Sequence, residues 1–225
     1  MFDRTISLIG NTNYQKIKSS NILVLGLGGV GGYALEALVR SGVENITLVD
    51  FDNIDITNIN RQIISLTNNI GNSKIDEWKK RILEINPNIN VKIINKKIDE
   101  NNIELLFDNN YDFIIDACDT IIVKKLLIKK CRENNIELIT VCGMGKKLNP
   151  TLVKICDLKD TCYDPLAKSL RKYVKDENIK GKIPCVFSDE RPIDSKNNIV
   201  SSMMLVPATA GILAAYYVIN KIINT

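Results

Sequence analysis

The 225-residue sequence lacks the features that would place it in several common classes of protein. Its six cysteines are scattered and no two of them form a C-x-x-C pair, so we expect no zinc site. The N-terminus has no sustained apolar segment like that of a signal peptide, and we therefore expect a cytoplasmic protein with mostly free thiols. A large excess of one charge is also missing: the formal net charge of +4 decides nothing about partners by itself.

Only one apolar stretch is long enough to raise the question of a membrane span. It covers residues 203–223, but Pro207, Thr209, Asn220 and Lys221 interrupt it. Buried helices of globular proteins have similar compositions. We favour a core or dimer-interface helix here over membrane association, although the sequence leaves open a loose association of this helix with a membrane.

Short apolar runs alternate with segments of helical periodicity along the first part of the chain. The runs cover residues 22–26, 46–50, 91–95, 111–116 and 136–141. Such alternation is typical of an α/β protein with a doubly wound, mainly parallel sheet and helices on both faces. Beyond residue 145 the pattern predicts a further strand (TLVKICDL), a charged helix near 165–177, a loop over 181–198 and the apolar helix. We read this part as a C-terminal appendage of one domain.

The first apolar run ends in a glycine-rich turn, ILVLGLGGVG. Gly26, Gly28 and Gly31 fit G-x-G-x-x-G, in which missing side chains let phosphate oxygens approach backbone N–H groups at a helix start. The next run ends in Asp50, where a carboxylate can accept hydrogen bonds from ribose hydroxyls. The glycines alone could form a tight turn in any doubly wound protein. Together with Asp50 they predict a Rossmann-like nucleotide site.

The segment after the second run distinguishes ATP chemistry from that of an NAD enzyme. It reads DFDNIDITNINRQ and places Asp52, Asn58 and Arg61 just beyond a strand's carboxyl end, where ligands bind in open α/β sheets. Charge develops on the phosphates when ATP is cleaved, and Arg or Lys side chains stabilise it. Arg61 is therefore a candidate phosphate clamp, while Asp52 could instead cap a helix or turn.

Two later segments add candidates for the same chemistry. Lys74 opens a predicted helix, so that its ammonium and the positive helix end would act on the same side, and Trp78 of that helix is expected in the core. The fourth run ends in IIDACDT, which supplies Asp116 and Asp119 at a strand end, where a carboxylate could hold magnesium. Asp116 could equally be structural, and Asp119 could cap the next helix.

The motifs GLGGVG, DFDNIDITNINRQ, GNSKID and DACDT, in this order, resemble the ubiquitin-activating-like (ThiF/MoeB/HesA) family over about residues 1–145. The resemblance implies an enzyme that adenylates a carboxylate, with ATP and Mg²⁺ as cofactors. It implies Arg61, Lys74 and Asp119 as catalytic residues, with Asp119 on Mg²⁺. The residues implied to bind ATP are Gly26, Gly28, Gly29, Gly31, Asp50, Asp52, Asn58 and Arg4. Because Arg4 matches an arginine that reaches the partner subunit's ATP, a homodimer is also implied.

The second half of the chain is similar to one branch, the tRNA threonylcarbamoyladenosine dehydratases. The segments LNPTLVKICDLKDTCYDPLAKSLRKYVK and IPCVFSDERP, the latter with CVFS as a strand, carry this resemblance. It implies a single ThiF-type adenylating domain over residues 1–225, with an ATP-binding core (1–145) and a part that completes the substrate site or the dimer (146–225). The implied reaction is the ATP-dependent cyclisation of threonylcarbamoyladenosine beside the anticodon.

Basic residues in the second half could contact the tRNA anticodon region. The candidates are Lys168, Arg171 and Lys172, for which a solvated helix face is the alternative. For the basic residues of 124–132 we favour the solvated face. Cys185 matches the neighbourhood in which relatives have a thioester-forming cysteine and is a candidate nucleophile, although a buried strand thiol is an equal alternative.

Two alternative functions stay open at this point. An adenylyltransferase for the C-terminus of a small ubiquitin-like sulfur-carrier protein would share the front half, but that branch usually carries two C-x-x-C pairs. A non-catalytic NAD-binding or interaction module belongs to another class. The sequence also leaves open an accessory sulfur-transfer protein as a partner.

Overall fold

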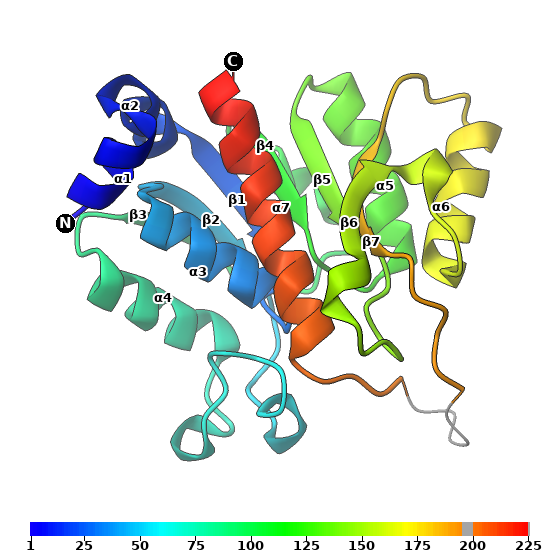
Figure 1. Cartoon of the computed structure of the whole chain (residues 1–225), viewed down its shortest axis with the longest axis horizontal. Helices are drawn as coiled ribbons and strands as arrows, with labels where there is room; N and C mark the ends of the chain where they lie inside the picture. The colour runs from blue at the N-terminus through cyan, green and yellow to red at the C-terminus, as the bar shows by residue number, and fades with distance from the viewer. Residues whose placement is uncertain (195–199, 225) are drawn as a thin grey trace.

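A computed structural model describes residues 1–194 and 200–224 and places seven strands in one sheet (Figure 1). The strands are β1 (Asn21–Leu25), β2 (Asn45–Val49), β3 (Asn90–Ile94), β4 (Phe113–Asp116), β5 (Glu137–Val141), β6 (Val153–Asp157) and β7 (Pro184–Ser188). Their order is β3-β2-β1-β4-β5-β7-β6, and all neighbours pair in parallel except β6, which is antiparallel to β7. The predicted doubly wound, mainly parallel sheet is confirmed.

Helices cover both faces of this sheet, as the sequence predicted. They are α1 (Asp3–Ile9), α2 (Asn11–Ser19), α3 (Gly31–Ser41), α4 (Lys74–Ile85), α5 (Ile121–Glu133), α6 (Pro165–Asp176) and α7 (Leu205–Asn224). Ile22 and Val24 of β1 belong to a core shared with α3, α4 and α7, whereas Leu23 and Leu25 belong to a second core with α5 and α6. Side chains alternate along a strand, so a strand buried on both faces needs an unbroken apolar run.

The second half of the chain extends the same sheet. Residues 185–188, implied as a strand by the resemblance, lie within β7, although the composition of 181–198 predicted a loop there. The loop prediction was wrong for these residues because polar and glycine residues flank a strand of only five residues. Residues 195–199 of that stretch lie outside the described residues.

Helix α7 is long and apolar enough, by length and composition alone, to cross a membrane, and half of that span is buried inside the protein. It packs along α3, where a Cβ on Gly211 would lie 2.2 Å from the Val30 carbonyl oxygen. Val206, Ala210, Ala214 and Val218 are fully buried. The small and apolar residues of α7 are thus explained by close packing within the chain.

The sheet positions the site at the carboxyl ends of its parallel strands. The segment after β2 lies at the lower edge of the molecule in Figure 1, and α1 and α2 lie at the upper left. No element was predicted for the residues of α1 and α2. Helix α1 buries no residue, whereas α2 buries Tyr14 and Ile17.

Candidate active site

A cavity of about 470 Å³ lies at the carboxyl ends of β1, β2 and β4. The glycine turn, the segment after β2, the start of α4 and the loop after β4 all contribute to its wall. Most of the predicted site residues line it: Gly26, Gly28, Gly29, Asp50, Asp52, Asn58, Arg61, Lys74 and Asp119. The fold therefore gathers residues that are up to 93 positions apart in the sequence, between Gly26 and Asp119, around one space.

The glycine turn is too tightly packed for side chains. Gly26 has φ +83°, and a Cβ on it would lie 2.9 Å from the Ala117 carbonyl oxygen. Gly31 begins α3, and its Cβ would lie 1.8 Å from the Gly26 oxygen. Gly31 itself does not line the cavity, so its part in nucleotide binding is to permit the turn. Phosphate oxygens can thus approach the backbone of the turn.

Asp50 holds this turn in place. One carboxylate oxygen, Oδ2, accepts a 2.6 Å hydrogen bond from the Leu27 N–H. The other, Oδ1, accepts from the N–H groups of Phe51 at 2.7 Å and Asp52 at 2.9 Å. Each carboxylate oxygen has about two acceptor positions. Asp50 therefore keeps capacity to accept a further hydrogen bond, as the predicted ribose contact requires.

Lys74 brings a buried cation to the cavity wall. It is the first residue of α4 and only 2% exposed. Its Nζ lies 3.0 Å from Asp52 Oδ2 and 3.8 Å from Asp50 Oδ1. Asp52 is thus an ion partner of Lys74. The ammonium and the N-terminal end of α4 act with the same sign at this wall.

Arg61 is held by its own loop. Its Nη1 donates to the Thr57 carbonyl oxygen at 2.7 Å and to Asn60 Oδ1 at 2.9 Å. Asn58 Oδ1 in turn accepts from the Asp55 N–H at 3.2 Å, in a capping box at the 3₁₀ helix Ile56–Asn58. These contacts orient Arg61 and Asn58 on one short, internally bonded segment.

Asp116 and Asp119, whose roles the sequence left open, have different surroundings in the structure. Asp116 is fully buried, with Oδ2 3.0 Å from the Lys124 ammonium and accepting from Thr140 Oγ1 at 2.6 Å. Burial alone would lower the pKa of Lys124, but the Asp116 carboxylate raises it. Asp116 is therefore structural. Asp119 is exposed at the cavity, and the N-cap residue of α5 is Thr120, so the capping alternative for Asp119 is not realised.

The donor set is compatible with magnesium only if the substrate contributes ligands. Within residues 1–194 and 200–224, no group of three or more Cys, Asp or Glu side chains could hold a metal ion alone. Magnesium commonly uses one or two carboxylates together with substrate phosphates and water. Asp119 could supply such a carboxylate.

Some residues at the cavity were not among the predicted site residues. Gln62 is 7% exposed, and its Oε1 is buried without a hydrogen-bond partner in the described structure. Lys96 and Lys97 follow β3 and line the cavity beside Phe51, with Lys97 Nζ 5.7 Å from the Phe51 ring centre. The sequence places Lys96 and Lys97 just after a strand's carboxyl end, which could have marked them as candidates. It does not show that this strand, β3, lies beside β2 and so brings them to the cavity.

Comparison with known proteins places the chain in a family. The model of the ThiF family matches residues 2–225. The chain belongs to the ThiF family.

Two similar proteins and one solved structure show how far the likeness extends along the chain. The chain is 38% identical to the tRNA threonylcarbamoyladenosine dehydratase of Bacillus subtilis, over 99% of this chain and 94% of that protein. It is 39% identical to the protein of the same name from Escherichia coli, over 84% and 73%. A crystal structure of E. coli TcdA in complex with ATP superposes with a TM-score of 0.93 at 36% identity, covering 99% of this chain and 93% of that one.

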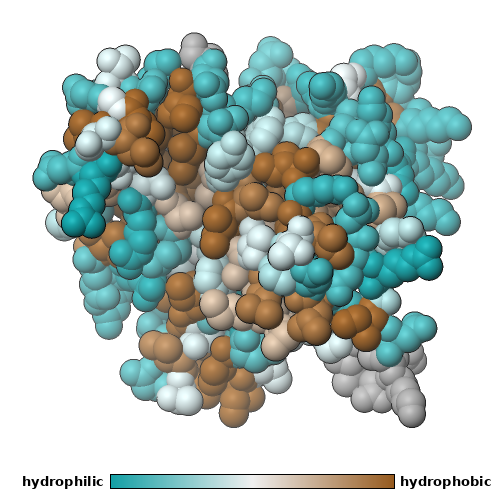
Figure 2. All heavy atoms as spheres, in the orientation of Figure 1, coloured by the Kyte–Doolittle hydropathy of each residue, from teal (hydrophilic) through white to brown (hydrophobic). Residues whose placement is uncertain are grey.

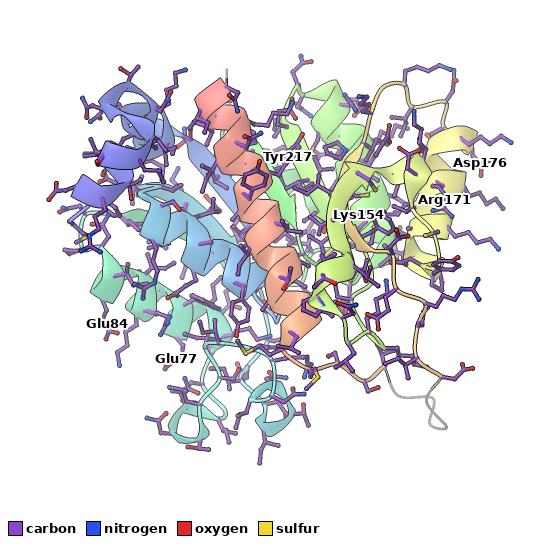
Figure 3. All side chains as sticks on the ribbon, viewed as in Figure 1. Glu77, Glu84, Lys154, Arg171, Asp176 and Tyr217 are labelled. Carbon is purple, nitrogen blue, oxygen red and sulfur yellow. The ribbon has the colours of Figure 1, made fainter. Side chains whose placement is uncertain are left out.

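The predicted tRNA-binding residues of this ThiF-family chain differ in their surroundings. Lys168 and Lys172 are exposed on α6. Arg171, labelled on α6 in Figure 3, is turned inward: its Nη1 donates to the Thr161 carbonyl oxygen at 2.9 Å and also contacts the Thr161 hydroxyl. Arg171 is partly buried and bonds the loop before α6, whereas its predicted contact with tRNA stays a prediction.

The basic group on α5 is largely paired within the protein. Lys124 is fully buried against Asp116, so the expectation of a solvated face was wrong for this residue. Lys129 pairs with Glu177 at 2.9 Å, and Lys130 contacts Glu104. Lys129 and Lys130 thus already have acidic partners within the protein.

Cys185 has the surroundings of a core thiol. It is fully buried on β7, and its Sγ lies 3.7 Å from that of Cys156 on β6. Hydrogen bonding with Cys142 and Cys156, together with burial, raises its pKa far above the usual range. A nucleophilic cysteine needs a thiolate and access to substrate. The structure favours the alternative of a buried strand thiol and does not support the candidate nucleophile.

Arg4 lies apart from the other predicted residues. It is exposed on α1 and does not line the cavity of its own chain. A role at the ATP site would therefore need a second subunit.

Proposed function

We propose that this chain is an ATP-dependent tRNA threonylcarbamoyladenosine dehydratase. The observation that carries the proposal is the cavity at the carboxyl ends of β1, β2 and β4, whose lining contains the glycine turn, Lys74 with its buried ammonium, and Arg61. This arrangement suits ATP. The relatives of that name resemble the chain well beyond this cavity, through β6, β7 and α6.

In the first step, an oxygen of the threonyl carboxylate attacks the α-phosphorus of ATP. The bond to the β-phosphate bridging oxygen breaks, pyrophosphate leaves, and an acyl adenylate forms. Negative charge grows on the phosphate oxygens during this step. Lys74 and Arg61, held by Asp52 and by Thr57, are preorganised cations that stabilise this charge without reorganisation.

In the second step, an atom of the same threonylcarbamoyl side chain attacks the activated carbonyl carbon. The attacking atom gives up its proton to solvent and AMP leaves with one carboxylate oxygen, so the nucleoside loses the elements of one water. The nucleophile is tethered, and its effective concentration is on the order of 10⁵ M or more. No enzyme nucleophile is needed, which agrees with the burial of Cys185.

Magnesium is part of the proposal through Asp119. With ATP bound, Asp119 would contribute one carboxylate oxygen to an ion whose other ligands are phosphate oxygens and water. The ion would supply charge neutralisation at the phosphates.

A homodimer would bring Arg4 of the partner subunit to the ATP site. Apolar side chains gather on the face shown in Figure 2, over α7 and over the segment after β2. They include Ile212 at 52% and Tyr216 at 55% exposure on α7, and Ile56 at 65% and Leu66 at 55% after β2. Exposed apolar groups of this kind often mark subunit contacts.

The tRNA surface is proposed to include Lys168 and Lys172 on α6. Both residues are exposed, and α6 lies on the same side of the molecule as β7 (Figure 1). Cytoplasmic location and an accessory sulfur-transfer protein remain predictions from the sequence.

The proposal is tested with purified protein, ATP, Mg²⁺ and tRNA that contains threonylcarbamoyladenosine. Mass spectrometry of the digested nucleosides should show the loss of one water from that nucleoside, and Lys74→Ala should slow this loss by about 10²–10³-fold. An unchanged nucleoside, with ATP and tRNA intact and bound, would overturn the proposal. The runner-up, adenylation of a small carrier protein, would then be tested by which partner stimulates ATP–pyrophosphate exchange.

A further inference from the structure

A second feature of the sheet's carboxyl edge lies beyond the ATP cavity. Tyr163, in the loop before α6, is 47% exposed, and the Arg191 guanidinium carbon lies 4.9 Å from its ring centre. Arg191 Nη2 is also 3.4 Å from the Tyr163 hydroxyl oxygen. Arg191 follows β7, so the two side chains come from segments 28 residues apart and meet at the surface.

The backbone at Tyr163 is unusual. It has φ +52°, in the left-handed region that side-chain-bearing residues seldom adopt. Such residues persist where the surroundings fix them, and they are frequent at ligand-binding positions. The residue that follows, Asp164, fixes this loop: its carboxylate accepts from Leu166 N–H at 2.8 Å and Ala167 N–H at 3.1 Å and so caps α6.

The same carboxylate ties the loop to the ATP cavity. Asp164 Oδ2 accepts a 2.6 Å hydrogen bond from the Gly143 N–H, and the next residues, Met144 and Gly145, line the cavity. Adjacent Cα atoms are about 3.8 Å apart, so the path from Met144 to Tyr163 along the backbone and through this bond is about 16 Å, and the separation in space is no longer than that. The exposed pair thus has a fixed position near the place where the substrate would react.

We infer that Tyr163 and Arg191 form a stacking platform for an unpaired base of the tRNA anticodon loop that flanks the modified adenosine. The inference rests on the proposed function. Unstacked RNA bases are commonly bound on aromatic rings and on guanidinium planes, and such stacking tolerates different bases. Lys168 and Lys172 are exposed on the helix that Asp164 caps, where their ammonium groups would neutralise backbone phosphates of the anticodon loop. The platform holds the loop, and the ATP cavity receives the threonylcarbamoyl group.

The test uses full-length protein and an anticodon stem-loop of the substrate tRNA, with dissociation constants measured by fluorescence anisotropy. Tyr163→Ala should weaken binding by about 5- to 100-fold, and Arg191→Ala should weaken it as well. Tyr163→Phe should bind like the unmodified protein, because stacking does not need the hydroxyl. The matched control is Lys221→Ala, which removes a cation 5.7 Å from the Tyr217 ring on α7, at the opposite edge of the sheet.

An abasic nucleotide next to the modified adenosine separates stacking from a structural effect. It should weaken binding to the unmodified protein and to Lys221→Ala, but hardly change binding to Tyr163→Ala, because the same contact is already lost. In turnover assays, Tyr163→Ala should raise KM for the tRNA and leave kcat nearly unchanged. Melting temperature and ATP affinity should not change.

Two outcomes would overturn the inference. Equal stem-loop affinity for Tyr163→Ala and unmodified protein, with ATP affinity intact, would show that no base stacks there. If Tyr163→Ala and the abasic nucleotide each weakened binding by the same factor whether or not the other was present, the base would not stack on Tyr163. A failure of the proposed function gives a different result: the wild-type protein itself would then leave the nucleoside unchanged.

Discussion

The ammonium of Lys74 and the carboxylate of Asp52 are 3.0 Å apart, although Lys74 is almost completely buried and Asp52 is exposed at the cavity. Asp50, 3.8 Å away, is the second carboxylate near this ammonium. The two carboxylates keep a buried cation in place before any phosphate arrives. They also set its position, because a long lysine side chain would otherwise sample many rotamers.

Replacing Lys74 with alanine is expected to lower kcat for nucleoside cyclisation by about 10²–10³-fold, as for the loss of a preorganised transition-state donor. ATP affinity should also fall, because Asp50 and Asp52 would repel the phosphates. The matched control is Lys80→Ala, which removes an exposed lysine of the same helix. Turnover near that of the control would contradict the role of Lys74.

Mixing two inactive variants tests the dimer. Arg4→Ala and Lys74→Ala are each expected to be inactive, but a heterodimer would contain one complete site with Lys74 from one chain and Arg4 from the other. Activity should therefore return when the two proteins are mixed and allowed to exchange subunits. Light scattering gives the oligomeric state. A monomer in solution, or no recovery despite subunit exchange, argues against a shared site.

Charge reversal of the two exposed lysines of α6, Lys168→Glu with Lys172→Glu, should weaken tRNA binding. Each lost phosphate contact is expected to reduce the slope of log affinity against log salt by about 1. ATP affinity should stay the same. Lys129→Glu is the control, because Lys129 lies on α5 and already pairs with Glu177. An unchanged salt dependence would exclude these lysines from the tRNA surface.

Cys185→Ala should retain turnover close to that of the unmodified protein. The side chain is fully buried between β5 and β6, and its substitution should cost about 1–2 kcal/mol of unfolding free energy through the small cavity left behind. Turnover and urea unfolding are measured together at a temperature where both proteins are folded. Loss of turnover in a fully folded variant would restore the cysteine as a nucleophile.

Glu36 on α3 predicts a pH dependence of stability. Burial alone would raise its pKa, but hydrogen bonds from Arg81 and Arg40, both 2.7 Å from its oxygens, hold it below the usual value. A lowered folded-state pKa stabilises the fold above the unfolded pKa of about 4.3, and this contribution is lost as the pH falls through the folded value. Glu36→Gln should therefore cost about 1 kcal/mol at pH 7.

The difference between Glu36→Gln and the unmodified protein should shrink as the pH falls below about 4. Thermal unfolding over a pH series measures it. The control is Glu84→Gln, an exposed residue of α4, labelled in Figure 3. A difference that stays constant down to pH 3 would show that Arg81 and Arg40 do not lower the pKa of Glu36.

Local sequence patterns were sufficient for strands β1 to β6 and for much of the cavity, but not for β7, where the composition predicted a loop. The apolar runs around Val24, Leu48 and Ile115 are long enough for buried strands, and polar residues at their carboxyl ends must meet at one edge in a parallel sheet. Asp50, Arg61 and Asp119 could be found in this way.

Other features depend on contacts that no local pattern reveals. Arg171 has the spacing of a surface residue on a charged helix, but it turns back to Thr161 of the preceding loop. Nothing in the local sequence distinguishes Lys124 from the neighbouring lysines. Only the structure shows that it is buried in an ion pair with Asp116, eight residues earlier. That Gln62 Oε1 is buried without a hydrogen-bond partner is visible only in the folded structure. These assignments needed the tertiary structure because each depends on which residues of other elements lie, or do not lie, next to the side chain.

The buried pair of Asp116 and Lys124 also has a consequence for motion. Lys124 Nζ donates to Asp116 Oδ2 and to the Val141 carbonyl oxygen at 2.8 Å, so one ammonium joins β4, α5 and the end of β5. The loop that carries Asp119 lies between the two partners. Separating Asp116 from Lys124 would leave an unpaired charge in the interior, which is costly. The ends of the loop are therefore anchored to each other, and β4, α5 and the end of β5 are expected to open together as one cooperative unit.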